Sequence, residues 1–369
     1  MNYIKQNKKF CMFYGILIIV SLISIIFTYN NHSFYQDTIA KITNIKDGYI
    51  TTEIADYGYK EDIYNQTIKA TILNGKYKGQ TITIDNRYYK GQTYSQKYHK
   101  NDEIFISLET HKDTIRNTHI EGYKRDKYIV ILLVPFMLII VLVGKLKGFL
   151  SIVSLIINIV LFNTIVYLNV KDISLPILSY IGAIIFSSIC LFLVSGKNKK
   201  TISAIISSIT GLTITLLISL IVINITNYSG LRFENMELLT RPYEGIFISE
   251  IILGGLGAIM DISISISSSL NEMLEKGTKI SSKQLIKSGF NIGRDIMSTM
   301  INVLFFTYIC SVIPNLCILL RNGINLGSLI NSYITLEMTR ALIGAIGITI
   351  TIPISIYITV LMYRRTIKW

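Results

Sequence analysis

Acidic side chains inside the apolar stretches of this chain are the residues most able to do chemistry. Asp261 lies near the end of an apolar run that extends from Glu244 to Ser267. At that position a carboxylate sits about 9 Å below the membrane interface and costs at least about 2.5 kcal/mol to insert. Such a group binds a cation or a proton, or it forms a buried ion pair or hydrogen bond, and the residues leave both roles open.

The run that carries Asp261 also places small and polar residues on one side. At 100° per residue, a stripe about 100° wide collects the polar and small residues, while most Ile, Leu and Met lie opposite. This is typical of a helix with one face turned away from lipid. The stripe consists of Glu250, Gly254, Gly257, Ala258, Asp261, Ser265 and Ser268.

Two later apolar runs carry similar stripes. Counting along the helices predicts that Asn302 lies level with Asp261 near the inner interface, and that Glu250 lies near Glu337 and Arg340 on the outer side. The candidate substrate or ion path therefore comprises Glu250, Asp261, Ser265, Arg294, Asp295, Asn302, Glu337 and Arg340. Glu337 and Arg340, at i,i+3, are also typical of a salt bridge at a loop end.

A simpler interpretation applies to the small residues on these stripes, namely helix packing. Glycine and alanine let membrane helices approach closely, because they put little or no side chain between two backbones. We therefore predict helix-packing roles, rather than ligand contacts, for Gly254, Gly257, Ala258, Gly344 and Gly347.

Signals for enzyme chemistry are absent from the sequence. All four histidines lie within residues 30–127 without metal-ligand spacing, and all four cysteines lie in apolar runs. The chain has no Walker motif, no GxGxxG and no GxSxG. We expect a non-enzymatic protein with no catalytic residue, no metal site and no cofactor.

Eight apolar runs predict about eight transmembrane helices. Residues 1–29 are expected to form an uncleaved signal anchor, and residues 128–369 a seven-helix membrane domain. Sixteen basic residues fall in the termini and the loops on one side of the membrane, against five in the opposite loops. By the positive-inside rule, both termini are cytoplasmic and residues 30–127 extracytoplasmic, in the cell membrane.

The polar segment of residues 30–127 differs sharply from the rest of the chain. Short runs rich in Ile, Thr and Tyr, separated by Gly, Asn and Asp, predict five or six strands in a small barrel of the OB or SH3 type, inserted after the first helix. The segment carries 15 basic and 13 acidic residues. That near balance argues against nucleic acid, so we expect a scaffold or a module that binds an envelope protein partner through residues 38–121.

With these stretches in view, the chain resembles the YibE/F-like family of bacterial membrane proteins. The resemblance covers residues 38–363 and implies a multi-spanning integral membrane protein with an external domain. It places motif residues at Asp261, Asn291, Gly293, Arg294, Asp295, Asn302, Glu337 and Arg340. It rests on three segments, GGLGAIMDISISISSSLNEM, SGFNIGRDIMSTMINVLFFTY and LEMTRALIGAIGITITIPISIYI.

These observations favour a membrane protein of the transport type, a permease or channel component for a small solute or cation. The polar faces of the sixth, seventh and eighth spans would surround its path. The alternative is a non-enzymatic envelope scaffold whose external domain binds a partner and whose polar helix faces only lock the bundle. The lipid bilayer is a partner in either case, and the sequence does not specify the oligomeric state.

Overall fold

The computed structural model describes residues 2–55, 59–91, 95–111, 114–171, 173–225, 243–276 and 280–363, together with 227, 228, 230, 231 and 233. Of the basic residues that predict the orientation, six lie outside the described residues: Arg232, Arg241, Lys279, Arg364, Arg365 and Lys368. The chain divides into two compact units, Met1–Val143 and Gly144–Trp369.

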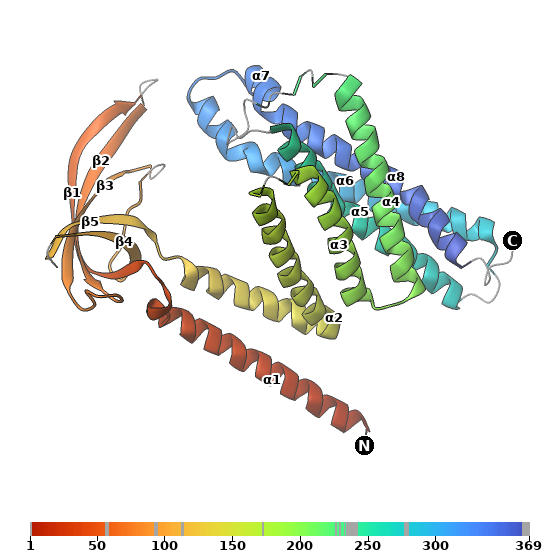
Figure 1. The fold of residues 1–369 in the computed structure, drawn as a ribbon, viewed down its shortest axis with the longest axis horizontal. Helices are drawn as coiled ribbons and strands as arrows, with labels where there is room; N and C mark the ends of the chain where they lie inside the picture. Colours follow the sequence, from red (N-terminus) through yellow and green to blue (C-terminus); the bar gives the residue numbers. More distant parts are fainter. Residues whose placement is uncertain are drawn as a thin grey trace. The chain divides into compact units, whose positions relative to one another are not determined.

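The first unit contains a helix and an antiparallel sheet of five strands, drawn from red to yellow in Figure 1. The helix is α1 (Asn2–Tyr29), followed by the short 3₁₀ turn η1 (His32–Phe34). The strand order across the sheet is β3-β2-β1-β4-β5. The strands are β1 (Thr38–Ala55), β2 (Tyr59–Ile72), β3 (Thr81–Tyr89), β4 (Glu103–His111) and β5 (Thr114–Tyr123).

Alternation of side chains determines which face of this sheet is buried. On β3, Ile82 and Ile84 are buried while Thr81 and Thr83 are exposed, as a period of two requires. β2 and β3 form a hairpin, whose connection contains Gly75 and Gly79 with φ of 75° and 86°. Such positive φ values are open to glycine because it has no Cβ. The prediction of a β-rich segment is confirmed.

The predicted small barrel of the OB or SH3 type is not confirmed, because the sheet is open among the described residues. β1 pairs with β2 along nearly its whole length but with β4 only over residues 38–41. Within the part of the chain that the structure describes, the edge strands β3 and β5 form no hydrogen-bonded ladder with each other. A barrel closes only when its edge strands pair. The sheet therefore keeps two free edges.

A buried lysine ties the sheet to the helices on either side of it. Lys124 is 1% exposed, and its Nζ lies 3.3 Å from Glu103 Oε2 of β4 and 2.8 Å from Asp126 Oδ2. The Thr28 carbonyl of α1 accepts from the same ammonium at 3.4 Å. Tyr35 donates to Asp126 at 3.0 Å, and burial, followed by this bond, raises the pKa of Tyr35 and keeps it a donor. The cluster fastens α1, β4 and the start of the next helix together.

The second unit is helical and is drawn from green to blue in Figure 1. Its centre is formed by α4, α5 and α8, with α6 packed on α8 and α3 packed on α5. A short helix and a π-helical turn, Ile330–Ile334, precede α8. The helices are α3 (Leu175–Ser195), α4 (Lys199–Ile225), α5 (Tyr243–Lys276), α6 (Ser282–Arg321), α7 (Leu326–Leu329) and α8 (Thr335–Met362).

Six helices, not eight, are long and apolar enough to cross a membrane among the described residues. The difference lies at the N-terminal side. Two apolar runs that predict separate spans are counted as one, because α2 (Asp126–Asn169) comprises two helices joined across a kink at Lys145, which has a non-helical φ of 51° and ψ of −129°. In α1 only Leu17–Tyr29 is counted as an apolar helix, which is too short for the count. The prediction of a predominantly helical, multi-pass protein stands.

Hydroxyl groups, not only apolar contacts, connect the central helices. Ser203 of α4 and Thr359 of α8 lie 2.7 Å apart, and Ser267 of α5 lies 3.1 Å from Thr359. A second pair, Ser355 of α8 and Ser263 of α5, is 3.4 Å apart. All five side chains are fully buried. The serines of α5 at these positions therefore face α4 and α8 and are used for helix packing.

Candidate functional site

Asp261 lies on α5 in a groove formed with α3 and with the part of α2 that belongs to the second unit. The groove has a volume of about 510 Å³. Its polar lining groups include Asp261 and Asn158, and no lysine or arginine of the described residues lines it. Most of its wall is apolar and aromatic, with Ile159, Phe162, Phe186, Leu253, Leu256 and Met260. The site is thus a carboxylate in an apolar groove.

Two oxygen-bearing side chains of this groove lack partners among the described residues. The Oδ1 atom of Asn158 is buried and accepts no hydrogen bond. Asp261 forms no ion pair or hydrogen bond there. Carboxylate and amide oxygens are the ligands that hard cations prefer, and a lone carboxylate also accepts a proton. Within the described residues no group of three or more His, Cys, Asp or Glu is placed to chelate a metal.

The structure does not bring the polar stripe of α6 into the groove that contains Asp261. Asn302, Arg294 and Asp295 are exposed, and none of them lines the groove. α6 instead turns glycines to α8: a Cβ added at Gly293 would come within 2.5 Å of Ile352. Two helices approach closely where one of them has residues without side chains. The face of α6 that carries Gly293 therefore packs against α8, and its polar stripe does not.

Ser265, one turn from Asp261 on α5, is half-buried and does not line the groove. Asn158, by contrast, lines the groove although it was not among the predicted site residues. A signal was present in the sequence, because Asn158 is a conspicuous polar residue within an apolar run. Nothing local to Asn158 indicates that it meets Asp261, which lies 103 residues away in the sequence.

A second charged cluster joins α5 to α8. Arg340 Nη1 lies 2.7 Å from Glu337 Oε1, and Arg340 Nη2 lies 3.2 Å from Glu250 Oε2. The guanidinium also stands 5.6 Å from the ring centroid of Phe247. Depth counting along the helices predicts this meeting of Glu250 with Glu337 and Arg340. The side chains of Arg340 and Glu337 are only 11% and 12% exposed, whereas that of Glu250 is 40% exposed, so the cluster is an ion triad with a buried centre and one outer carboxylate.

Four of the five small residues predicted to pack helices do so. A Cβ on Gly254 would collide with the hydroxyl of Tyr308 from α6, and one on Gly344 would come within 2.9 Å of Leu304. Gly347 has Thr215 at 3.0 Å, and Ala258 packs on the core formed by α5, α6 and α8. Gly257 is different: a Cβ there meets nothing within 4 Å, and the residue borders the Asp261 groove.

Gly254→Ala and Gly257→Ala form a matched pair on one helix. We expect Gly254→Ala to destabilise the protein by about 1–3 kcal/mol, the usual cost of overpacking. Gly257→Ala should leave stability unchanged or raise it by up to about 1 kcal/mol, because alanine is the better helix former. Thermal melting of the detergent-solubilised chain measures both. Equal melting temperatures for the two variants would contradict the assigned packing.

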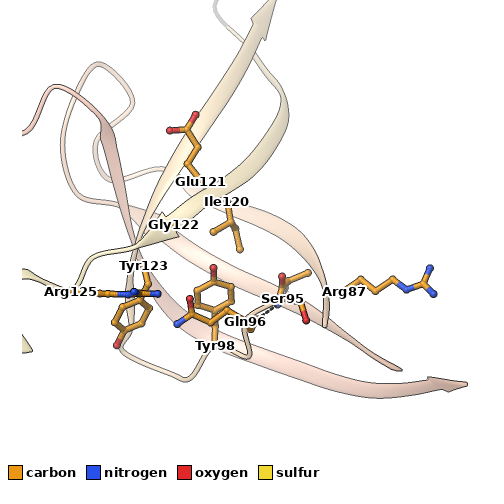
Figure 2. A pocket seen from close by; sticks show the side chains of 10 residues that line it. Arg87, Ser95, Gln96, Tyr98, Ile120, Glu121, Gly122, Tyr123 and Arg125 are labelled. Atoms are coloured by element: carbon orange, nitrogen blue, oxygen red, sulfur yellow. Dashed lines mark hydrogen bonds between the residues drawn. The ribbon is translucent and has the colours of Figure 1, made fainter. Parts of the chain in front are cut away.

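Two pockets lie along the seam between β3 and β5 in the first unit. One, of about 670 Å³, is lined by residues 80–85 and 115–119. The other, of about 650 Å³, is shown in Figure 2 with Arg87, Tyr98, Glu121 and Arg125 at its border. Burial raises the pKa of Tyr123, whose hydroxyl donates to Asp102 at 3.0 Å. The seam is therefore a polar groove between two free strand edges.

Two family models match the chain. A model described as YibE/F-like protein matches residues 132–365, and one described as YibE/F family N-terminal domain matches residues 33–123. No curated protein and no solved structure shows a significant match. The two matched ranges together account for most of the chain, and the shorter of them covers the sheet.

Proposed function

This chain belongs to the YibE/F-like family of membrane proteins, and from that premise we propose that it is a permease or channel component for a small solute or cation. The observation that carries the proposal is the carboxylate of Asp261 in a groove between α2, α3 and α5. A packing role would not need an ionisable group there, because serines, threonines and glycines already pack these helices.

The lining of the groove favours a cation over an anion. Asp261 contributes the negative charge and Asn158 an unused carbonyl oxygen, whereas the part of the chain that the structure describes adds no cationic side chain to the lining. Two donors are fewer than the six or more oxygens that calcium takes, so a monovalent cation or a proton fits better. The apolar wall strengthens the attraction because it lowers the local dielectric constant.

Residues on α6 do not contribute to this path. Arg294, Asp295 and Asn302 are exposed on the far side of that helix from its contact with α8. The path that we propose thus runs along α5 past Asp261, with α2 and α3 as its other walls. In the orientation that the basic loops predict, both termini lie in the cytoplasm and residues 30–127 lie outside the cell membrane.

Asp261→Asn is the variant that tests the path. In proteoliposomes loaded with a pH- or cation-sensitive dye, we expect flux to fall at least tenfold, because the amide has the same shape but neither charge nor affinity for a proton. Glu272→Gln on the same helix is the control, since Glu272 is exposed and pairs with Lys276 near the end of α5. Unchanged flux in folded Asp261→Asn protein would overturn the proposed role.

The seam between β3 and β5 favours a second candidate function, an envelope scaffold whose external domain binds a partner protein. Free edges offer backbone donors and acceptors, and Arg87, Glu121 and Arg125 add charge beside them (Figure 2). The same variant separates the two candidates. If the protein is a scaffold, Asp261→Asn would at most change the melting temperature. Deletion of residues 38–121 would then remove the phenotype that the protein confers on the cell.

A further inference from the structure

Helix α6 has two faces of opposite character. One face packs on α8 through Gly289 and Gly293, which lie against Ile356 and Ile352. The other face is polar and exposed, and within the described residues its side chains form no hydrogen bond or ion pair. We define the α6 polar face by its members, Asn291, Arg294, Asp295, Ser298 and Asn302.

A polar face at this position needs a polar partner. The apolar part of α6 begins at Ile296, so Asn302 lies about 9 Å further along the helix, at hydrocarbon depth. Lipid tails offer an amide no hydrogen bond, which makes an exposed asparagine there unfavourable. Arg294 and Asp295 stand next to this segment and bring two opposite charges to one depth.

We propose that the α6 polar face is the interface of a homodimer. Two copies of one chain insert in the same orientation, so their α6 helices meet in parallel around a two-fold axis along the membrane normal. Asn291, Ser298 and Asn302 lie along the centre of the face, where each meets its own copy. Asparagine and serine are the side chains that hydrogen-bond between membrane helices at such positions.

The two charges flank this centre on opposite sides. At 3.6 residues per turn, Arg294 lies about 60° to one side of Asn291 and Asp295 about 40° to the other. Around a parallel two-fold axis the flanks exchange, so Arg294 of each copy meets Asp295 of the other. The face is therefore complementary to itself and forms two ion pairs, and this charge pattern favours a second copy over lipid as its occupant.

Disulfide cross-linking in native membranes tests the contact. In a chain whose four cysteines are replaced by alanine, Asn302→Cys should form a linked dimer upon mild oxidation. Val303→Cys is the control at the same depth, because Val303 is 59% exposed but is rotated by about 100° from Asn302. Equal cross-linking at both positions, or adducts with a different protein, would overturn the proposal.

Charge exchange tests the pairing of Arg294 with Asp295. Arg294→Asp makes both flanks acidic and Asp295→Arg makes both basic, so each variant alone should dimerise at least tenfold less. Co-expressed with different tags, the two variants should capture each other, because acidic flanks then face basic ones. Such rescue also shows that both variants fold. If the mixed pair associates no better than either variant alone, the interface is not this face. Asp261→Asn should leave dimerisation unchanged, which separates this test from that of transport.

Discussion

Arg340→Leu is expected to lower the free energy of unfolding by about 3 kcal/mol or more, the cost of leaving buried charges without their partner. The variant removes the guanidinium that holds Glu337 at 2.7 Å and Glu250 at 3.2 Å. The carboxylates of Glu250 and Glu337 would then lose their ion pairs with Arg340. The loss is measured by thermal or SDS-induced unfolding of the solubilised full-length chain.

A neutral version of the same cluster isolates the effect of charge. The triple variant Glu250→Gln, Glu337→Gln and Arg340→Met should lose clearly less stability than Arg340→Leu alone, because no charge is left unpaired. Lys287→Gln on α6, an exposed cation of the same unit, should change nothing measurable. If the Arg340→Leu variant and the wild-type protein unfold at the same temperature or SDS concentration, the triad does not contribute to stability.

Lys124→Met should destabilise the first unit by about 3 kcal/mol, near the lower end of the cost of breaking a buried ion pair. Methionine fills a similar volume but leaves Glu103 and Asp126 without their shared cation. Asn31 and Tyr35 still donate to Asp126, and His32 lies 3.1 Å from Glu103 Oε2, which keeps the loss below the maximum. Limited proteolysis of the full-length chain within residues 33–123 should accelerate about a hundredfold.

Lys90→Met is the matched control for this variant. Lys90 pairs with Asp62 at 3.3 Å in the same unit, but the lysine side chain is 70% exposed. Solvent screens such a pair, so its loss should leave the proteolysis rate almost unchanged. Similar rates for the two variants would mean that the burial of Lys124 has no energetic consequence.

Local patterns in the chain predict local structure well. Long runs of Ile, Leu and Val predict the helices of the second unit, and alternating Ile and Thr predict strands such as β3 with its buried Ile82 and Ile84. Counting residues along helices also brings Glu250 to Arg340, because depth in a membrane follows directly from the 1.5 Å rise. Sheet closure was not predictable in this way, since it depends on whether two strands distant in sequence pair.

Lys124 shows a different limit of sequence reasoning. Its neighbours Arg125 and Lys127, and the start of an apolar run nearby, make it look like an ordinary interface charge. Only the fold shows that Glu103 from β4 and Asp126 from α2 approach it from two sides. No pattern within a few residues of Lys124 carries that information.

The amino-acid sequence by itself determined the membrane class of this protein, its helices and strands, and the residues that give each helix a polar face. Tertiary structure alone decided which way each face points. Lipid tails are as apolar as leucine, so hydrophobicity does not select the inward face of a membrane helix. Glycine contacts and buried hydroxyl groups select the inward face instead. They turn Gly293 of α6 toward α8 and its polar stripe outward, and they place Asp261 of α5 beside Asn158 rather than Asn302.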